Sequence, residues 1–323
     1  MDCNILKLDL KDKRILYELD KNCRQSCSEI SRKVQLSQEA VNYRIKKLEE
    51  QKIITNYQLI VNLSKLGLIQ FKVLLSFQHI NSEKLNKIIE ELNKKPEVKW
   101  VVSCKGNWDL LISLETDSLN EINNLKNKII NSFGNLINKK AISIGVSAEV
   151  YDRNFFLNKK EGNVERIIIN EEKKVKLDEI DLEIIIKLSK NARKSVVDIA
   201  SELKTSARIV NYRIKQLQKR KVINGFRISI NYEKLGMQFY KLFLYLDKSS
   251  PKRINDLVTY FRSNKNIIHN VKVLGNWEFE PEFEVSSENE FNSLLSSMKD
   301  QFSDIIKTID IITISKEHKF VYL

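Results

Sequence analysis

The amino-acid sequence predicts an α+β protein in which a unit of two domains occurs twice. The first observation is an internal repeat: residues 8–67 align without a gap with residues 177–236, at a shift of 169 positions, and 24 of the 60 aligned pairs are identical. The second is the order of expected elements in both halves, three helices and then strands that alternate with helices. The third is an excess of basic residues confined to the helical segments. A period this long indicates a duplicated pair of domains rather than a solenoid.

The repeat extends well beyond the helical segments. Its longest identical block, Val41 to Lys46, recurs from Val210 to Lys215. The same shift carries the turn Gly106-Asn107-Trp108 onto Gly275-Asn276-Trp277. Each residue of interest therefore has a repeat equivalent, 169 positions away, that serves as an internal control.

Length and composition indicate folded domains without a membrane segment. A chain of 323 residues with 42% hydrophobic content is long enough for two or more cores. Its purely apolar runs are only a few residues long, and the N-terminus, Met1-Asp2-Cys3-Asn4, lacks a charged and then apolar leader. We expect a cytoplasmic protein that does not associate with a membrane.

The basic charge separates the two kinds of segment. Of the net charge of +13, residues 1–67 contribute +4 and residues 173–236 contribute +9, whereas residues 68–172 and 237–323 contribute +1 and −1. A basic surface on one module type suggests a polyanion as its partner. A merely soluble basic protein would show the same total, so charge alone does not decide between the two.

The cysteines and histidines argue against a metal site, and we expect no cofactor. Cys23 and Cys27 are close enough in sequence to suggest a metal site, but their repeat equivalents, Ala192 and Val196, are apolar. We expect the thiols, including Cys104, to act as small core residues in a reducing compartment. No second histidine or cysteine stands at ligand spacing from any of the three histidines, which are His79, His269 and His318.

Three helices are expected in each copy of the basic unit. Apolar residues at helical spacing predict the first over residues 9–21 and again over residues 178–190. Ser26 and Glu29 have the form of a capping box at the start of a short second helix, and residues 195–198 are a weaker version. A serine precedes the third helix in both copies as its expected N-cap.

The third helix combines an apolar stripe with a polar and basic face. Val41, Ile45 and Leu48 have the spacing of residues that face a core, and the N-terminal end of such a helix enters the major groove in helix-turn-helix proteins. Asparagine pairs bidentately with adenine, lysine reaches guanine or a phosphate, and arginine suits a phosphate. The predicted DNA-contacting residues are Ser37, Gln38, Glu39, Asn42, Tyr43, Arg44 and Lys46 in the first copy and Ser206, Ala207, Arg208, Asn211, Tyr212, Arg213 and Lys215 in the second.

The alternative for each of these residues, taken singly, is a solvated helix face. The pattern as a whole favours DNA contact, because Asn42, Tyr43, Arg44 and Lys46 are identical in the two copies at positions that packing does not dictate. Two further features belong to the same unit. Arg24 and its equivalent Arg193 are candidates for a second contact with the DNA backbone or, equally, for an ion pair with an acid of the first helix. Residues 53–59 and 222–228 are each expected to form a short β-hairpin, a wing that lies along the phosphates.

These residues resemble the Lrp/AsnC family, the feast/famine transcription regulators. The matching pattern includes Leu8-Asp9-x-x-Asp12, Asn22-x-Arg24-x-Ser26, Leu36-Ser37-x-x-x-Val41-x-x-Arg44-Ile45 and Leu66-Gly67, and it recurs from Leu177 to Gly236. A pattern over about sixty residues is far more specific than a short motif. The resemblance implies a winged helix-turn-helix followed by a ferredoxin-like βαββαβ domain that assembles the protein and senses small molecules. The expected domains are residues 1–64, 65–153, 176–233 and 234–323, with the charged residues 154–175 as a linker.

The sequence after each basic unit fits that fold independently. In the first copy, strands are expected over residues 69–77, 98–104 and 110–115 and within 136–150, and helices over 82–93 and 119–133. In the second copy the same order is expected over residues 239–246, 252–261, 267–274, 279–285, 288–302 and 305–314.

The resemblance also implies an amino-acid-like effector bound between such domains. It would lie near the turn formed by Gly106, Asn107, Trp108 and Asp109; the alternative is a glycine hairpin with a packed tryptophan. The second copy departs after its turn, where Glu280, Pro281, Glu282 and Glu284 follow. The proline predicts an edge strand or a bulge, and the acids are expected to repel a carboxylate effector.

The leading hypothesis is a sequence-specific regulator of transcription, not an enzyme, that binds double-stranded DNA. One chain would mimic the usual dimer of the family, with further homo-oligomers left open. Gln38 and Glu39 correspond to Ala207 and Arg208, so the two heads should read different half-sites, with Arg208 as a candidate guanine reader. One alternative is an enzyme like the siroheme decarboxylases. His269 is the only residue that suggests this comparison. Another alternative is a ligand sensor that acts through protein partners.

Overall fold

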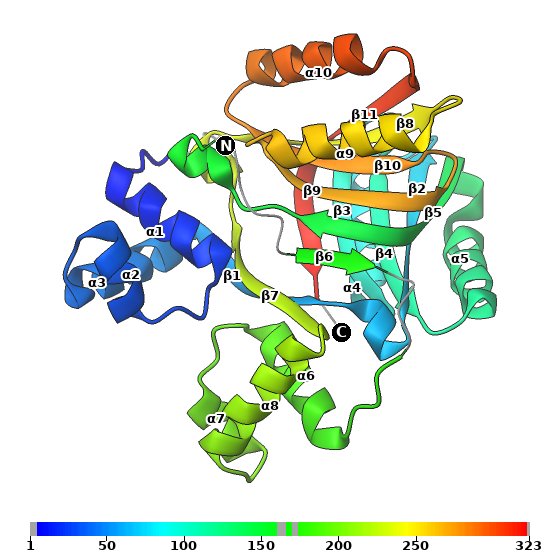
Figure 1. The fold of residues 1–323 in the computed structure, drawn as a ribbon. Coiled ribbons are helices and arrows are strands. Elements are labelled where there is room, and N and C mark those ends of the chain that lie inside the picture. The colour runs from blue at the N-terminus through cyan, green and yellow to red at the C-terminus, as the bar shows by residue number, and fades with distance from the viewer. Residues whose placement is uncertain (1–4, 160–165, 170–173, 322–323) are drawn as a thin grey trace.

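The computed structural model describes residues 5–159, 166–169 and 174–321, and it shows two similar halves (Figure 1). The N-terminal Met1 to Asn4, and with it Cys3, lies outside the described residues, as do residues 160–165 and 170–173 of the expected linker. Each half contains a head of three helices, followed by four strands and two helices of a ferredoxin-like domain. None of the helices in the described ranges is long and apolar enough to cross a membrane.

The three helices predicted for each head are present. They are α1 (Leu10–Lys21), α2 (Cys27–Val34) and α3 (Gln38–Glu50) in the first head and α6 (Glu179–Lys190), α7 (Val196–Glu202) and α8 (Ala207–Lys219) in the second. The predicted capping box is formed: the Ser26 hydroxyl accepts from the Glu29 N–H, and the Glu29 carboxylate accepts from the Ser26 N–H at 2.7 Å. Ser37 and Ser206 cap the third helices as predicted. Local sequence therefore determines where these helices begin.

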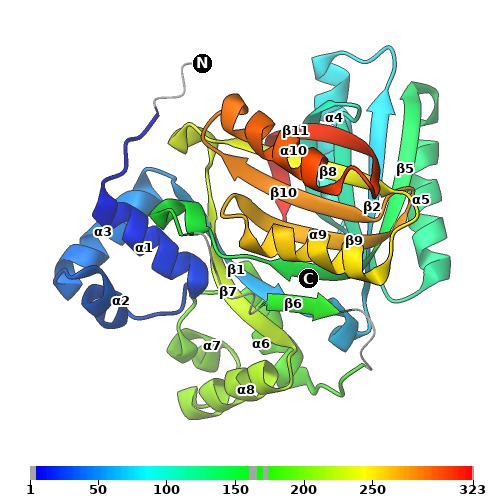
Figure 2. The same cartoon turned by 45° about the horizontal axis from the view of Figure 1, so that its top comes forward.

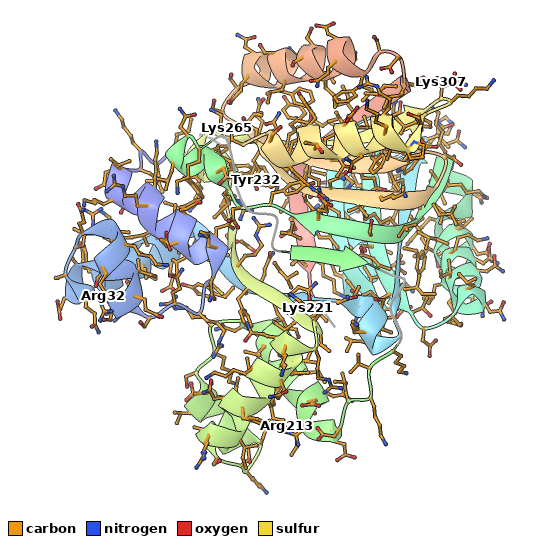
Figure 3. The ribbon with its side chains drawn as sticks, in the orientation of Figure 1. Arg32, Arg213, Lys221, Tyr232, Lys265 and Lys307 are labelled. Carbon is orange, nitrogen blue, oxygen red and sulfur yellow. The ribbon has the colours of Figure 1, made fainter. Side chains whose placement is uncertain are left out.

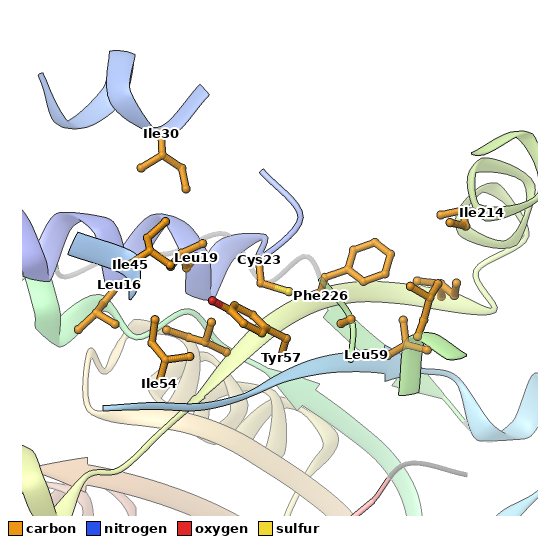
Figure 4. Packing of buried hydrophobic residues seen from close by; sticks show 14 of the residues in the cluster. Leu16, Leu19, Cys23, Ile30, Ile45, Ile54, Tyr57, Leu59, Ile214 and Phe226 are labelled. Carbon is orange, nitrogen blue, oxygen red and sulfur yellow. The ribbon is translucent and has the colours of Figure 1, made fainter. Parts of the chain in front are cut away.

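One apolar core runs through both heads. Figure 4 shows Cys23 of the first head beside Tyr57 and Phe226, which come from strands of different halves. The apolar stripe of each third helix joins this core, since Val41 and Val210 are fully buried. Burying a valine or leucine side chain contributes roughly 1.5–3 kcal/mol, so the two heads stabilise each other rather than folding as isolated units.

The expected wings are not hairpins. Residues 54–61 form a single strand, β1 (Ile54–Val61), which pairs in antiparallel fashion with β7 (Ile223–Ile230) of the other half. The prediction of one hairpin per head was wrong, because each strand satisfies its backbone groups with its repeat equivalent instead of with its own neighbour. The resulting β1–β7 ribbon lies between the two heads (Figure 1).

The remaining strands form two ferredoxin-like sheets. The first contains β2 (Ile69–Phe77), β3 (Val98–Gly106), β4 (Leu110–Thr116) and β5 (Ile137–Val150) in the order β5-β2-β4-β3, with helices α4 (Ser82–Lys94) and α5 (Leu119–Phe133). The second contains β8 (Gln238–Leu246), β9 (Ile267–Gly275), β10 (Phe279–Val285) and β11 (Ile306–Phe320) in the order β11-β8-β10-β9, with α9 (Pro251–Ser263) and α10 (Glu288–Phe302). Figure 2 shows α9 and α10 over the outer face of the second sheet.

The two sheets are joined to each other along both edges. The C-terminal part of β5 pairs with β9, and that of β11 pairs with β3, so the eight strands close into a ring. The last strand of the second copy runs to Phe320, six residues beyond its expected end, because this extension pairs with β3. An inner apolar cluster that includes Leu74, Trp108, Phe243 and Trp277 fills part of the ring.

The structure adds short elements to the expected linker and excludes one of the two alternatives for the strand that contains Pro281. The stretch expected as a linker contains a short 3-10 helix, η3 (Asn154–Leu157), and a strand, β6 (Arg166–Ile169), which pairs with β5. Pro281 lies in β10, which pairs with both β8 and β9, so this strand is not an edge strand. The other expected alternative, a bulge, agrees better with the structure, since the pairing with β9 is irregular between Glu282 and Phe283. Residues 280 and 281 form no registered pair with β8, which accommodates the missing proline N–H.

Candidate nucleic-acid interface

The predicted DNA-contacting face lies on the surface in both heads. Asn42 and Asn211 are exposed, and the residues Tyr43 and Tyr212 are 68% and 58% exposed although they are large and partly apolar. Gln38, Glu39, Lys46, Arg208 and Lys215 are exposed as well, whereas Ala207 is half-buried. Figure 3 shows the side chains around both heads, where Arg32 marks the first head and Arg213 the second. Packing thus leaves the equivalent polar faces of both third helices uncovered.

The two third helices begin with the same kind of cap, but their first turns carry charges of opposite sign. The Ser37 hydroxyl accepts from the Ala40 N–H at 3.2 Å, and the Ser206 hydroxyl accepts from the Ile209 N–H at 3.2 Å. In the first head, hydrogen bonds from its own backbone N–H and from Ser37 lower the pKa of Glu39. Arg208 occupies the equivalent position in the second head. Free N–H groups at a helix N-terminus attract anions, and Arg208 adds to that attraction while Glu39 opposes it.

The two arginines of the identical block lie between helices rather than on the open face. Arg44 Nη1 donates to Asp9 at 2.7 Å and to Asp12 at 2.6 Å, which ties α3 to the start of α1. Arg213 Nη1 donates in the same way to Asp178 at 2.5 Å and to Asp181 at 3.2 Å. These ion pairs orient the third helix against the first, which explains why both copies have an arginine at this position. A contact of either arginine with a phosphate stays a prediction.

Arg24 and Arg193 do not form the expected ion pair with an acid of the first helix, and their contact with the DNA backbone stays a prediction. Arg24 Nη1 donates to the carbonyl oxygens of Ala192 and Lys194 in the other head, at 2.7 and 2.9 Å, and Arg193 Nη1 donates to that of Cys23 at 2.6 Å. Their guanidinium groups also lie 5.5 Å from the centroids of the Phe226 and Tyr57 rings, respectively. Among the described residues, neither arginine pairs with an acid of a first helix. They are reciprocal clamps that fix one head against the other.

A buried charge network connects the first head to the ribbon and to the second sheet. Asp20 in α1 accepts from Arg153 Nη1 at 2.6 Å and from Arg227 Nη2 at 3.0 Å, and Arg153 also donates through Nε and Nη2 to Glu284 in β10. All four side chains are at least nine-tenths buried. Burial alone would lower the pKa of Arg153, but Glu284 and Asp20 raise it, so the guanidinium stays charged. This network could not be predicted from the internal repeat, because the residues equivalent to Asp20 and Arg153 are Ser189 and Tyr322.

The candidate effector turns lie at the seam between the two sheets. A Cβ on Gly106 would come within 2.6 Å of the Ile311 carbonyl oxygen, and Asn107 Nδ2 donates to Asp310 at 2.9 Å. The Asp109 carboxylate accepts from the Phe77 N–H at 2.7 Å, and Trp108 is buried. All four residues of this turn are thus engaged in packing with other strands, and effector binding there stays a prediction.

The acids that follow the second turn are neutralised inside the protein. Glu280 pairs with Lys72 of the first sheet and with Lys241 of the second at 2.9 Å, and Glu282 pairs with Lys241 at 2.8 Å. Burial alone would raise the pKa of Glu280, but Lys241 and Lys72 lower it to about 2. The expectation that these acids repel a carboxylate effector was wrong, because buried lysines and Arg153 balance their charge.

A cavity of about 490 Å³ lies between the β1–β7 ribbon and the inner face of the strand ring. The ribbon contributes Gln58 and Arg227, and the strands contribute Glu115, His269 and Glu282. His269 Nδ1 lies 3.3 Å from the Glu282 carboxylate. None of the four candidate effector-binding residues lines this cavity. The sequence had singled out His269 but not the cavity, whose walls come from both halves.

Comparisons with known proteins identify both heads as helix-turn-helix domains. Residues 8–55 match a winged helix-turn-helix DNA-binding model, and residues 177–218 match the AsnC-type helix-turn-helix domain. The crystal structure of the siroheme decarboxylase NirDL in complex with an iron-uroporphyrin III analogue is similar over nearly the whole chain, with a TM-score of 0.62. That likeness covers 98% of this chain and 94% of the other at 13% sequence identity, so it concerns the fold.

Two relatives are more similar in sequence. An uncharacterized HTH-type transcriptional regulator of Pyrococcus furiosus is 32% identical over 116 residues, which are 36% of this chain and 77% of the relative. The transcriptional regulator AzlB of Bacillus subtilis is 30% identical over 146 residues, which are 45% of this chain and 88% of AzlB. Because a relative of this identity is matched over most of its length, the chain belongs to the Lrp/AsnC family of transcription regulators.

Proposed function

We propose that the chain is a sequence-specific, DNA-binding transcription regulator whose two heads read two half-sites of one duplex. The observation that carries the proposal is the pair of exposed faces on α3 and α8, each with asparagine, tyrosine and lysine at identical positions. Packing does not require these side chains to be the same in both copies. A ligand that both heads bind is the simplest explanation of their identity. Asn42 and Asn211 would contact base edges, while Lys46 and Lys215 would reach guanine or phosphates.

The connection between the heads supports a single-chain equivalent of a dimer. The β1–β7 ribbon, the common apolar core and the two arginine clamps fix the heads relative to each other. Rigid heads related by an approximate two-fold axis require half-sites at a fixed separation, about 10 bp or a multiple of it. An extended linker between independent heads would impose no such spacing.

The two half-sites are proposed to differ in sequence. The first helix positions carry Gln38 and Glu39 in one head and Ala207 and Arg208 in the other, and three of these four side chains are exposed. Arginine pairs bidentately with guanine, and glutamate accepts from cytosine. We further propose that the chain acts in the cytoplasm and catalyses no reaction. An amino-acid-like effector bound near the Gly106 turn remains part of this proposal.

Selection of bound duplexes from a random DNA pool tests the proposal. The wild-type chain should enrich two unlike half-sites at a constant separation. A variant with Asn42→Ala and Asn211→Ala should lose the enrichment, whereas Asn123→Ala on the exposed part of α5 should not. Absence of any enriched sequence, or equal enrichment by the double variant, would contradict the proposal.

A second candidate function is chemistry on a tetrapyrrole. It is favoured by the whole-chain likeness to a siroheme decarboxylase together with the position of His269 in the cavity. Incubation of the protein with siroheme distinguishes the two functions. A shift of the absorbance band that depends on His269 would support this candidate, and an unchanged spectrum would reject it.

A further inference from the structure

The cavity contains a buried carboxylate without a partner. Glu115 in β4 is 7% exposed, and neither of its carboxylate oxygens has a hydrogen-bond partner among the described residues. Ser113, two residues earlier on the same face of β4, is 2% exposed and its hydroxyl is also unpartnered in the described part of the chain. Both line the cavity of about 490 Å³. Buried polar groups are normally paired, so an unpaired acid facing a cavity calls for a specific explanation.

The internal repeat shows what normally pairs with a carboxylate at this position. The strands β4 (Leu110–Thr116) and β10 (Phe279–Val285) are equivalent at the shift of 169, which makes Glu284 the equivalent of Glu115. Arg153 holds Glu284 through two bonds, from Nε at 2.8 Å and from Nη2 at 2.9 Å. This is the bidentate geometry that a guanidinium group forms with a carboxylate.

Among the described residues, no arginine holds Glu115 in the same way. The position equivalent to Arg153 is 322, where the sequence has a tyrosine. In the sheet, the residue opposite Glu115 on β2 is Gln70, which is uncharged. Lys99 lies at an irregularity in the pairing of β3 with β4 and is near enough to lower the pKa of Glu115, but the described residues include no ion pair between them. Arg153 thus pairs with Glu284 in the wall of the cavity. We call the part lined by Glu115 and Ser113, where the described residues form no such pair, the open half.

We propose that this open half is a binding site for a small molecule with a guanidinium group, which pairs with Glu115 as Arg153 pairs with Glu284. The class of ligand follows from the two unpartnered carboxylate oxygens of Glu115. A planar guanidinium group can donate to both oxygens at once, whereas an ammonium group is a single point charge. The cavity is within the usual size range of small-molecule sites. The site is separate from the Gly106 turn, and it stands whether or not the heads bind DNA.

Calorimetric titration of the full chain tests the site with defined probes. Agmatine and L-arginine carry the guanidinium group, and L-citrulline has the same shape with an uncharged group in its place. At about pH 8 the Glu115 carboxyl is mostly ionised, since burial raises its pKa to about 7. Agmatine or L-arginine should saturate one site per chain, and citrulline should bind at least about tenfold more weakly.

Three variants connect the binding to Glu115. Glu115→Gln removes the charge without changing the size of the side chain and should weaken agmatine binding at least about tenfold. Gln70→Arg supplies a guanidinium from the strand opposite Glu115, so it should abolish binding and raise the Tm. Glu90→Gln, an exposed position on α4, is the matched control and should bind agmatine like the wild type.

The outcomes separate clearly. Saturation by a guanidinium probe that is lost in Glu115→Gln and retained in Glu90→Gln supports the site. The proposal is overturned if neither probe saturates, if citrulline binds as tightly as L-arginine, or if Glu115→Gln binds agmatine like the wild type. The Tm of Glu115→Gln, which should not fall, shows that lost binding is not lost folding.

Discussion

Gln58 and Arg227 are repeat equivalents that lie opposite each other in the β1–β7 ribbon. Their pairing places the approximate two-fold axis of the molecule at this point, with one head on each side. The backbone is symmetric here, but the charge is not: Arg227 donates to Asp20 of the first head, whereas the equivalent of Asp20 in the second head is Ser189. A duplicated chain can thus keep the frame of a dimer while its two halves acquire different side chains.

Asp20→Asn should strongly destabilise the fold. The change leaves the buried guanidinium groups of Arg153 and Arg227 without their shared carboxylate, which typically costs about 3–5 kcal/mol. Chemical denaturation of the variant measures the free energy of unfolding. The equivalent change, Ser189→Ala, removes one hydroxyl that bonds within its own helix and should cost about 1 kcal/mol or less. Equal losses in the two variants would contradict the assignment of the network.

Arg24→Ala should loosen the contact between the heads without unfolding either. The change removes the donors for the carbonyl oxygens of Ala192 and Lys194, at a cost of about 1–3 kcal/mol. Amide hydrogen exchange in residues 191–194 should therefore become faster, by about tenfold for each 1.4 kcal/mol. Arg32→Ala, an exposed arginine on α2, provides the control. Unchanged exchange in the Arg24 variant would show that the clamp is dispensable.

Glu115→Gln should change how stability depends on pH. Burial raises the folded-state pKa of this carboxyl from 4.5 to about 7, so the folded protein holds the proton more tightly than the unfolded chain. Wild-type stability should therefore fall as pH rises from about 4.5 to about 7, by up to about 3 kcal/mol from this group alone. The variant should lack this component and be the more stable protein at pH 8. Parallel pH profiles of the unfolding free energy for the two proteins would contradict the account.

Lys46→Ala tests the assignment of phosphate contacts. Loss of one such contact should reduce the slope of log affinity against log salt by about 1, because one fewer condensed counterion is released. Fluorescence anisotropy of a labelled duplex, titrated at several salt concentrations, measures that slope. Lys87→Ala, on α4 and outside the heads, should leave it unchanged. A slope that Lys46→Ala does not alter would reject this role for the lysine.

Features that depend on neighbouring residues could be predicted from the sequence. The caps at Ser26 and Ser37 were predicted correctly because a capping bond joins residues three positions apart. The bounds of α5 and β2 followed from apolar periodicity within one element. The exposure of Asn42 and Asn211 followed from their place opposite the apolar stripe of the third helix.

Features that depend on the other half of the chain could not be predicted. Residues 53–59 have the same alternating pattern whether the partner strand is local or lies 169 positions away, so the β1–β7 pairing was missed. Arg24 was expected near DNA or an acid because its partners, two backbone carbonyl groups, leave no signal in the sequence. Glu280 was expected to be an unpaired acid, because its partner Lys72 could not be identified from the sequence. Lys72 lies in a run of residues that otherwise predicts a buried strand.

The central claim is that each head reads its own half-site, and Arg208→Ala tests it most directly. The measurement is the affinity for a selected duplex and for two derivatives, each with one half-site replaced. We expect the variant to lose discrimination, by about 1–3 kcal/mol, at the half-site read by α8 and to keep it at the other. Equal losses at both half-sites, or no loss at either, would contradict the account of two distinct reading heads in one chain.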